Sequence, residues 1–191
     1  IGSSLSCVEI VLAISKQKGI NIFSKASGAA TPYVLLDKDW KYLKENPLFW
    51  PGGSLGHGLP IATGNALGNR TKKVYCLMSD AELDEGTTWE SLLFASHHKL
   101  NNLFIIIDYN KLQSCGSNKE ILNLESLADK FKAFGCEVRQ VDGHDQNKIE
   151  SCLNYPSLYK DKPIAVIAHT IKGKGVDWME NNYEWHYKNL D

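Results

Sequence analysis

Apolar residues fall along this chain in short unbroken runs, separated by stretches in which they recur at helical spacing. The runs 74–78 and 103–107 are almost continuously apolar, which is typical of strands buried on both faces of a parallel sheet. Further strands are predicted at 137–141 and 164–168. Strands and helices that alternate in this way predict an α/β fold with a doubly wound, mainly parallel sheet and helices on both faces.

The stretches between these runs carry helix start and stop signals. Thr87 and Glu90 fit a T-x-x-E capping box, and the residues expected on the buried face of that helix are Trp89, Leu92, Leu93, Ser96 and Leu100. Gly135 is placed to end the helix before 137–141, and Asp145 to cap the helix after it. The chain from 74 to 107 is therefore predicted to form one βαβ crossover, which is almost always right-handed.

Polar side chains directly follow the two central apolar runs. Asp80 follows the first run and Asn110 the second, so in parallel strands both would lie at the carboxyl edge of the sheet, where open α/β sheets bind ligands. A carboxylate, an amide oxygen and a loop carbonyl suit Mg²⁺ or Ca²⁺, which keep phosphate oxygens among their ligands. Turn formation explains Asp and Asn after strands about equally well, so these residues alone leave both interpretations open.

Composition narrows the class of protein. A chain of 191 residues with 43% hydrophobic and 23% charged residues is ordinary for one globular α/β domain. A net charge of -1 with scattered Lys and Arg argues against nucleic-acid binding. Five cysteines without a C-x-x-C pair indicate a reducing, cytoplasmic location rather than disulfides or zinc. No segment approaches the roughly 18 apolar residues needed to cross a bilayer, so we expect no membrane association.

Several ordered segments resemble the transketolase family. Residues 80–86, followed by Asp108-Tyr109-Asn110, are similar to its thiamine diphosphate motif, which usually begins Gly-Asp-Gly and ends in Asn. Residues 53–59 resemble the family segment Gly-Ser-Leu-Gly-Gln-Gly, and 170–176 and 179–186 match two downstream segments. The resemblance extends over most of the chain and implies a single diphosphate-binding domain with the thiamine diphosphate-binding fold.

The resemblance implies a set of cofactor ligands. Gly53, Ser54 and Leu55 would contact the aminopyrimidine and thiazolium region of thiamine diphosphate. The divalent ion that bridges to the diphosphate would be held by Asp80, Asn110 and the backbone carbonyl of Leu112.

Two substitutions alter the diphosphate motif. Ala81, a cofactor-binding candidate, and Ser79 stand where the family has Gly, and their side chains restrict the close approach of backbone to a diphosphate. Metal binding should survive these substitutions, whereas the effect on cofactor affinity is left open.

His186 is the acid-base candidate, because a neutral imidazole can exchange a proton near physiological pH. A lone His is more often a surface or core residue, but the resemblance gives His186 catalytic and cofactor-binding roles near the diphosphate. Lys172 and Lys174 form a basic loop, either near phosphate or simply solvated. Glu85 suits a helix start, and the resemblance implies that it faces a partner subunit.

Two histidines of the family pattern are absent. Ser24-Lys25-Ala26 resembles Ser-Lys-Gly-His-Ala without Gly-His, and the later Gly-His-Pro segment is not visible. Either the chain is divergent or mobile active-site loops are missing from residues 1–191, and we favour missing loops because such loops carry binding residues. The chain also opens in a serine-rich helix without Met, so we expect missing N-terminal residues.

The resemblance implies transfer of a two-carbon ketol unit from a ketose to an aldose, with sugars or sugar phosphates as substrates. In this family the cofactor is activated by a Glu of another domain, so we expect activity only with a C-terminal pyrimidine-binding subunit, in a heterotetramer. Two alternatives are a thiamine diphosphate enzyme acting on a 2-oxo acid and a non-catalytic assembly subunit.

Overall fold

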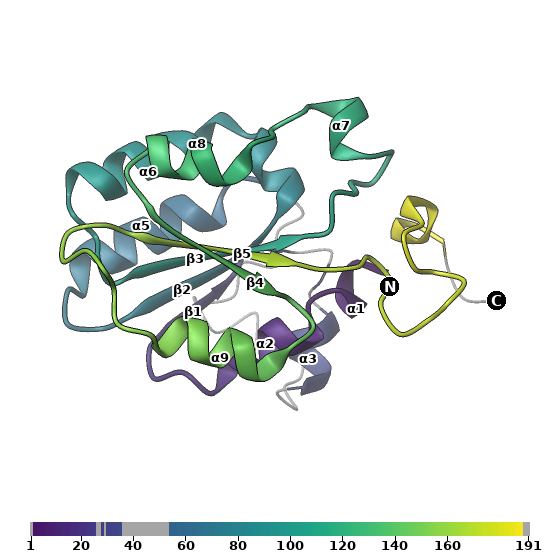
Figure 1. Ribbon diagram of the computed structural model, residues 1–191, viewed down its shortest axis with the longest axis horizontal. Coiled ribbons are helices and arrows are strands. Elements are labelled where there is room, and N and C mark those ends of the chain that lie inside the picture. The colour runs from purple at the N-terminus through teal and green to yellow at the C-terminus, as the bar shows by residue number, and fades with distance from the viewer. Residues whose placement is uncertain (1, 26–27, 29, 36–53, 189–191) are drawn as a thin grey trace.

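The computed structural model of the chain is built around a five-stranded sheet (Figure 1). The strands are β1 (Ile20–Phe23), β2 (Val74–Ser79), β3 (Leu103–Tyr109), β4 (Glu137–Asp142) and β5 (Ile164–His169). Their order across the sheet is β1-β2-β3-β5-β4, and each pair of neighbours is parallel. The structure describes residues 2–25, 28, 30–35 and 54–188, and within them the predicted doubly wound α/β fold is confirmed.

Helices cover both faces of this sheet. In Figure 1 the upper face carries α5 (Gly58–Gly68), α6 (Gly86–His97) and α8 (Leu127–Ala133). The lower face carries α2 (Val8–Ser15), α3 (Ala30–Leu35) and α9 (Gln146–Asn154). The shorter elements are α1 (Gly2–Leu5), α7 (Asn118–Ile121) and the 3₁₀ turns η2 (Asp80–Asp84) and η3 (Tyr183–His186).

Side chains of the two central strands are buried on both faces, which explains their unbroken apolar runs. Cys76 and Ile105 belong to the core beneath α5, α6 and α8, whereas Leu77 and Ile106 belong to the core beside α2 and α9. Successive residues of a strand point to opposite faces, so a strand covered on both sides has a nearly continuous apolar sequence. Every residue of β2 and β3 is buried.

The register of the central strands brings their ends together. Ser79 pairs with Asp108, so Asp80 and Asn110 leave the sheet at the same edge, as predicted. Tyr109 pairs with His169 at the end of β5, which brings the loop after β5 to that edge as well.

Two predictions about α6 were wrong. The helix begins at Gly86 with Glu85 as its N-cap, and Thr87 donates its hydroxyl to the carbonyl of Gly56 at 2.7 Å instead of capping the helix. Leu93 is 59% exposed, because each helical residue turns by about 100° and the residue after buried Leu92 is carried off the core face.

Other local signals were confirmed. Gly135, with a φ of 85°, follows α8, and the Asp145 side chain accepts the Lys148 N–H at 3.0 Å to cap α9.

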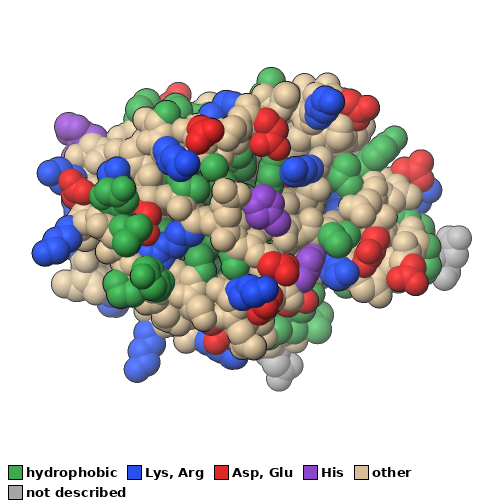
Figure 2. All heavy atoms as spheres, in the orientation of Figure 1, with side chains coloured by type: hydrophobic (Ala, Val, Ile, Leu, Met, Phe, Trp, Pro, Cys, Tyr) green, Lys and Arg blue, Asp and Glu red, His purple; other side chains and the backbone are tan. Residues whose placement is uncertain are grey.

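All five cysteines are free thiols. On the face shown in Figure 2, the described Lys and Arg side chains are interspersed with Asp and Glu. The described residues contain no helix that is both long and apolar enough to cross a bilayer.

Candidate functional site

A cavity of about 500 Å³ lies at the carboxyl edge of the sheet, beside the ends of β2 and β3. Of the predicted site residues, it is lined by Leu55, Asp80, Ala81, Asn110, Leu112 and His186. Ser54 is exposed and does not belong to the lining, and Gly53 lies outside the described residues. The structure therefore brings together most of the residues that the sequence assigned to one site.

Asp80 is 2% exposed and is held by donors from the loop after β3. Its Oδ2 accepts from the Lys111 backbone N–H at 2.7 Å and from Asn118 Nδ2 at 3.1 Å, and its Oδ1 accepts from Ala81 N–H at 3.0 Å. Burial, followed by the charge of Asp108, raises the pKa of Asp80 to about 6. Asp80 forms no ion pair within the described part of the chain, so its carboxylate lacks a directly bound cation.

Asn110 and Leu112 supply neutral oxygens beside Asp80. Asn110 Oδ1 accepts from the Leu112 N–H at 3.1 Å, and the Leu112 carbonyl lies 3.4 Å from Lys172 Nζ. The described residues contain no cluster of three His, Cys, Asp or Glu that could hold a metal ion. One carboxylate, one amide and one carbonyl nevertheless form a hard-oxygen set of the kind that Mg²⁺ or Ca²⁺ completes with water and phosphate.

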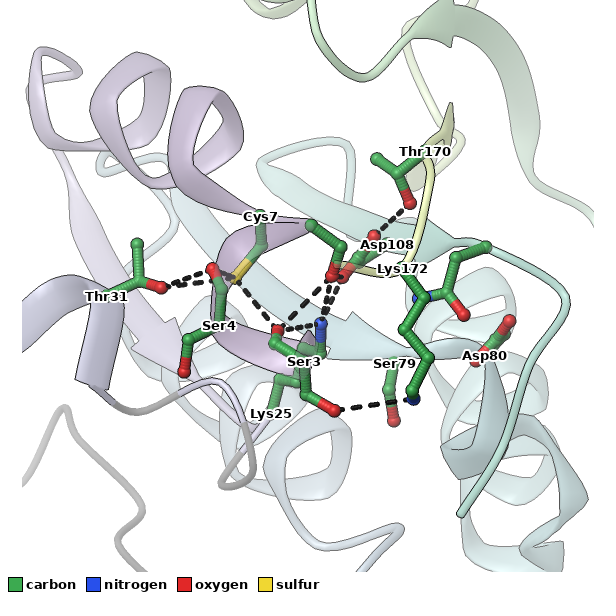
Figure 3. Close-up of polar contacts among 12 residues, drawn as sticks. Ser3, Ser4, Cys7, Lys25, Thr31, Ser79, Asp80, Asp108, Thr170 and Lys172 are labelled. Carbon is green, nitrogen blue, oxygen red and sulfur yellow. Dashed lines mark hydrogen bonds and ion pairs between the residues drawn. The ribbon is translucent and has the colours of Figure 1, made fainter. Parts of the chain in front are cut away.

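Lys172 brings a buried cation into the lining of the cavity. The residue is 2% exposed, and its Nζ lies 3.4 Å from Ser3 Oγ (Figure 3). The same Nζ is 3.4 Å from His186 Nδ1. Burial, followed by the charge of Lys25, lowers the pKa of Lys172 to about 8. Lys174, in contrast, is partly exposed and pairs with Glu180 at 3.3 Å. Of the two lysines, only Lys172 belongs to the site.

His186 lies in the cavity as a neutral imidazole. Its Nδ1 is 3.1 Å from Ser3 Oγ, and burial, followed by the charge of Lys172, lowers the pKa of His186 to about 4. In this state it is a hydrogen-bonding group at pH 7, so proton exchange by His186 would need added negative charge nearby. Its acid-base role stays a prediction.

A buried ion pair that sequence reasoning missed lies beside the cavity. Lys25 Nζ contacts Asp108 Oδ2 and donates to Ser6 Oγ at 2.9 Å and to the Ser3 carbonyl at 2.6 Å. Thr170 donates its hydroxyl to the other oxygen of Asp108 (Figure 3). Burial alone would raise the pKa of Asp108 and lower that of Lys25, but their mutual attraction reverses both directions. Both groups are therefore charged.

Glu82 is a second buried group that was missed. It accepts hydrogen bonds from the Ser24 hydroxyl, from Ser79 N–H at 3.0 Å and from Gly56 N–H at 3.3 Å. Gly56 has a φ of 75°, and a Cβ there would lie 2.6 Å from Glu85 Cβ, so only glycine fits. Glu82, in the turn η2, is therefore hydrogen-bonded to the loop that contains Gly56. The Ser79-x-x-Glu82 spacing of a capping box was the signal that could have revealed it.

Comparison with known proteins identifies the family. A family profile described as "Transketolase, thiamine diphosphate binding domain" matches residues 55–191. The chain belongs to the transketolase family. The matched region contains most of the cavity lining, including Asp80, Asn110, Lys172 and His186.

Two transketolase relatives show how much of each protein corresponds to this chain. An apulose-4-phosphate transketolase subunit of Actinobacillus succinogenes is 37% identical over 226 aligned positions, which cover 98% of this chain and 81% of that protein. A 6-deoxy-6-sulfo-D-fructose transketolase subunit, SqwG, of a Clostridium species is 38% identical over 142 positions, covering 72% of this chain and 52% of that protein. The chain thus spans most of the first relative and about half of the second.

Solved transketolase structures share the fold. The crystal structure of Campylobacter jejuni transketolase superposes with a TM-score of 0.76 at 25% identity, covering 94% of this chain and 35% of that one. A Pichia stipitis transketolase gives a TM-score of 0.77 at 21% identity and covers 90% of this chain and 32% of its own. The sheet and helices are therefore those of the transketolase thiamine diphosphate-binding fold, and this chain spans about a third of each solved chain.

The cavity fits a divalent cation and a diphosphate in charge and donor type. Asp80 is a buried carboxylate without an ion pair among the described residues, and Asn110 and Leu112 line the same cavity. Lys172 is a buried ammonium whose nearest partners are neutral. A buried charge is costly unless it is paired, so bound ligand charges of both signs would relieve the two costs.

Proposed function

We propose that this transketolase-family chain is the N-terminal, diphosphate-binding subunit of an enzyme that transfers a two-carbon ketol unit from a ketose to an aldose. The observation that carries the proposal is the opposed pair of buried charges, Asp80 and Lys172, that face one cavity at the carboxyl edge of the sheet. That edge is where α/β sheets bind ligands.

Each residue of the cavity has a role in this proposal. Asp80, Asn110 and the Leu112 carbonyl hold Mg²⁺ or Ca²⁺, and Lys172 and His186 face the diphosphate. Thiamine diphosphate, when bound, would stabilise a carbanion.

The glycine-rich loop completes the cofactor site in this proposal. Gly53, Ser54 and Leu55 contact the aminopyrimidine and thiazolium region, while Ala81 lies against the diphosphate.

A second polypeptide is part of the proposal. Both relatives are named as transketolase subunits, which supports a heteromer. We extend this proposal to a heterotetramer with a pyrimidine-binding subunit. Glu85 is exposed at the start of α6 and would face that partner. The names also refer to sugars, one of them a phosphate, which supports sugar or sugar phosphate substrates. Five free thiols support a cytoplasmic location.

The missing histidine between Lys25 and Ala26 favours one alternative, an enzyme acting on a 2-oxo acid. We propose instead that residues 1–191 are one diphosphate-binding domain from which loop residues are missing. The 226 positions aligned with the first relative exceed the 191 residues of this chain, so that relative carries residues inside the aligned region that this chain lacks. Peptide mapping of the expressed protein distinguishes the two: Gly-His after Lys25 supports missing loops, and Lys25 bonded to Ala26 supports divergence.

Calorimetric titration with thiamine diphosphate at fixed Mg²⁺ tests the proposed site. The wild-type chain should bind, and Asp80→Ala should weaken binding at least about tenfold, the lower end of the loss seen when even outer-shell groups of metal sites are removed. Asp129→Ala, which removes an exposed carboxylate on α8, is the matched control and should bind normally. Equal affinity of Asp80→Ala and wild type would contradict the assignment.

A further inference from the structure

His144 lies in the turn between β4 and α9, one residue before Asp145, the predicted cap of α9. Its backbone N–H donates to Asp142 Oδ1 at 3.0 Å, and Gly143 N–H donates to the His169 carbonyl at 2.8 Å. A Cβ at Gly143 would lie 2.3 Å from Thr170 Cγ2, so the turn can approach the end of β5 only because that residue is glycine. The approach brings the His144 side chain to the loop that follows β5.

The imidazole of His144 bridges two elements through its two nitrogens. Nε2 accepts the backbone N–H of Ile171 at 2.8 Å, and Nδ1 lies 3.4 Å from Glu9 Oε2 on α2. A backbone N–H can only donate, so Nε2 must carry a lone pair and the ring proton must be on Nδ1, facing Glu9. The observed contact therefore requires neutral His144.

Ile171 immediately precedes Lys172, the cation of the cavity. Beside Lys172, the Ile171 N–H donates to His144 and the Gly173 N–H donates to the Gly2 carbonyl at 3.1 Å. Among the described residues, the carbonyls of Ile171 and Gly173 accept only from within the same loop, from the N–H groups of Lys174 and Val176. The Lys172 carbonyl accepts from Asn181 N–H at 3.0 Å. The direction of the Lys172 side chain thus depends on an imidazole that does not itself line the cavity.

We propose that His144 is a positioning residue for the diphosphate: through the Ile171 N–H it holds the backbone that aims Lys172 into the cavity. The inference rests on the proposed function, because the diphosphate is the ligand toward which Lys172 is aimed. It makes cofactor binding depend on a residue that does not itself line the cavity.

Two amide variants distinguish the roles of the two ring nitrogens of His144. In His144→Gln the amide oxygen can take the place of Nε2 and still accept from Ile171, whereas the shorter side chain of His144→Asn reaches only the position of Nδ1. Neither amide titrates. Thermal unfolding of both variants shows whether each is folded, and the comparison is made between the two rather than with a deletion.

The first measurement is hydrogen exchange of the Ile171 amide in the ligand-free full chain, with the Gly173 amide as internal reference. Wild type should protect Ile171 at about pH 8. His144→Gln should keep that protection, because its amide oxygen can accept from the Ile171 N–H, and His144→Asn should lose it.

The second measurement is the dissociation constant of thiamine diphosphate with Mg²⁺, by calorimetry. At about pH 8, His144→Asn should bind about tenfold more weakly than wild type and His144→Gln, the size expected for the loss of one hydrogen bond that orients a charge. Equal affinities of the Asn and Gln variants would overturn the inference. An exchange rate of the Ile171 amide that is the same in His144→Asn as in wild type would also overturn it.

The two measurements keep this inference distinct from the proposed function. A wild-type chain that binds no cofactor at any pH would refute the proposed function, and with it the role of His144 toward a diphosphate. Normal cofactor binding by wild type and by both variants would refute only the role of His144.

Discussion

Asp80 and Lys172 bring opposite charges into one cavity, yet each is held by neutral groups. The nearest partners of Asp80 are two backbone N–H groups and the Asn118 amide, and those of Lys172 are a hydroxyl, a carbonyl and an imidazole. Burial therefore shifts both pKa values toward the neutral form, to about 6 and about 8. Groups with such shifts in a cavity are typical of functional sites.

The shift at Asp80 predicts a pH dependence of stability in the metal-free protein. The pKa rises on folding from 3.8 to about 6, so the folded state favours the protonated carboxyl. Stability from this group is complete below pH 3.8 and is lost as pH rises to about 6. With a chelator present, the unfolding free energy of wild type relative to Asp80→Asn should fall by about 2 kcal/mol between pH 4 and pH 7. Urea denaturation measures this difference, and a pH-independent one would contradict it.

Lys172 should strengthen the binding of thiamine diphosphate and lower the stability of the ligand-free protein. Lys172→Met should weaken binding of thiamine diphosphate roughly 10- to 100-fold, because a charge-assisted hydrogen bond is lost. The same change should stabilise the ligand-free protein at pH 7 by up to about 3 kcal/mol, since burial lowers the pKa of Lys172 from 10.5 to about 8. Lys174→Met, at the partly exposed lysine two positions on, is the control for calorimetry and urea denaturation. Equal effects of the two changes would show that Lys172 has no special role.

Among the elements, β3 provides the contacts that hold several connecting segments at the carboxyl edge of the sheet. Its Asp108 contacts Ser6 between α1 and α2, Lys25 after β1 and Thr170 after β5. These contacts hold three connecting segments at one place beside the cavity. The site thus depends on how several elements end, as well as on the residues that line it.

Removing Asp108 alone should be strongly destabilising. Asp108→Ala leaves the Lys25 ammonium buried without its counter-ion, and breaking a buried pair in this way costs about 3–5 kcal/mol. The double variant Lys25→Met, Asp108→Asn removes both charges and should recover much of that loss. A double-mutant cycle with Lys25→Met and Asp108→Asn, measured by urea denaturation, gives the coupling free energy, and additive effects would contradict the pair.

At the scale of the whole molecule, the described chain places one cavity at the carboxyl edge of a sheet that lies between two helix layers. The chain spans 81% of one curated relative, about half of another and about a third of the solved transketolases. In the proposed function, ketol transfer also uses groups of a pyrimidine-binding subunit. Assembly and cofactor binding become linked if the cofactor is buried between subunits.

Purified alone, the chain should bind thiamine diphosphate weakly and transfer no ketol group. Adding the pyrimidine-binding subunit should strengthen binding and restore transfer, because each ligand of a shared interface stabilises the assembled state. Calorimetry measures the binding, and chromatographic detection of the new ketose measures transfer, with the partner alone as control. Robust turnover by the isolated chain would refute the two-subunit proposal.

Much of the fold and part of the site follow from local patterns in the sequence. Continuous apolar runs specify β2 and β3 because both faces of these strands are buried, and strands of a parallel sheet end at a common edge. Asp80 and Asn110 could therefore be placed side by side from their positions directly after two strands. The short signals at helix ends were less reliable, because Thr87 bonds to the distant Gly56 instead of capping α6.

By itself the sequence determined the four strands β2 to β5, the burial of β2 and β3, and the place of Asp80 and Asn110 at the edge of the sheet, since these depend on neighbours in the chain. It did not reveal β1. Only the tertiary structure decided the partners of buried charges: Lys25 meets Asp108 from 83 positions away, and Ser24 meets Glu82 from 58. It likewise decided that His144 holds Ile171, 27 positions on. No local pattern encodes such contacts, and the pKa values of the site follow from the burial that they create.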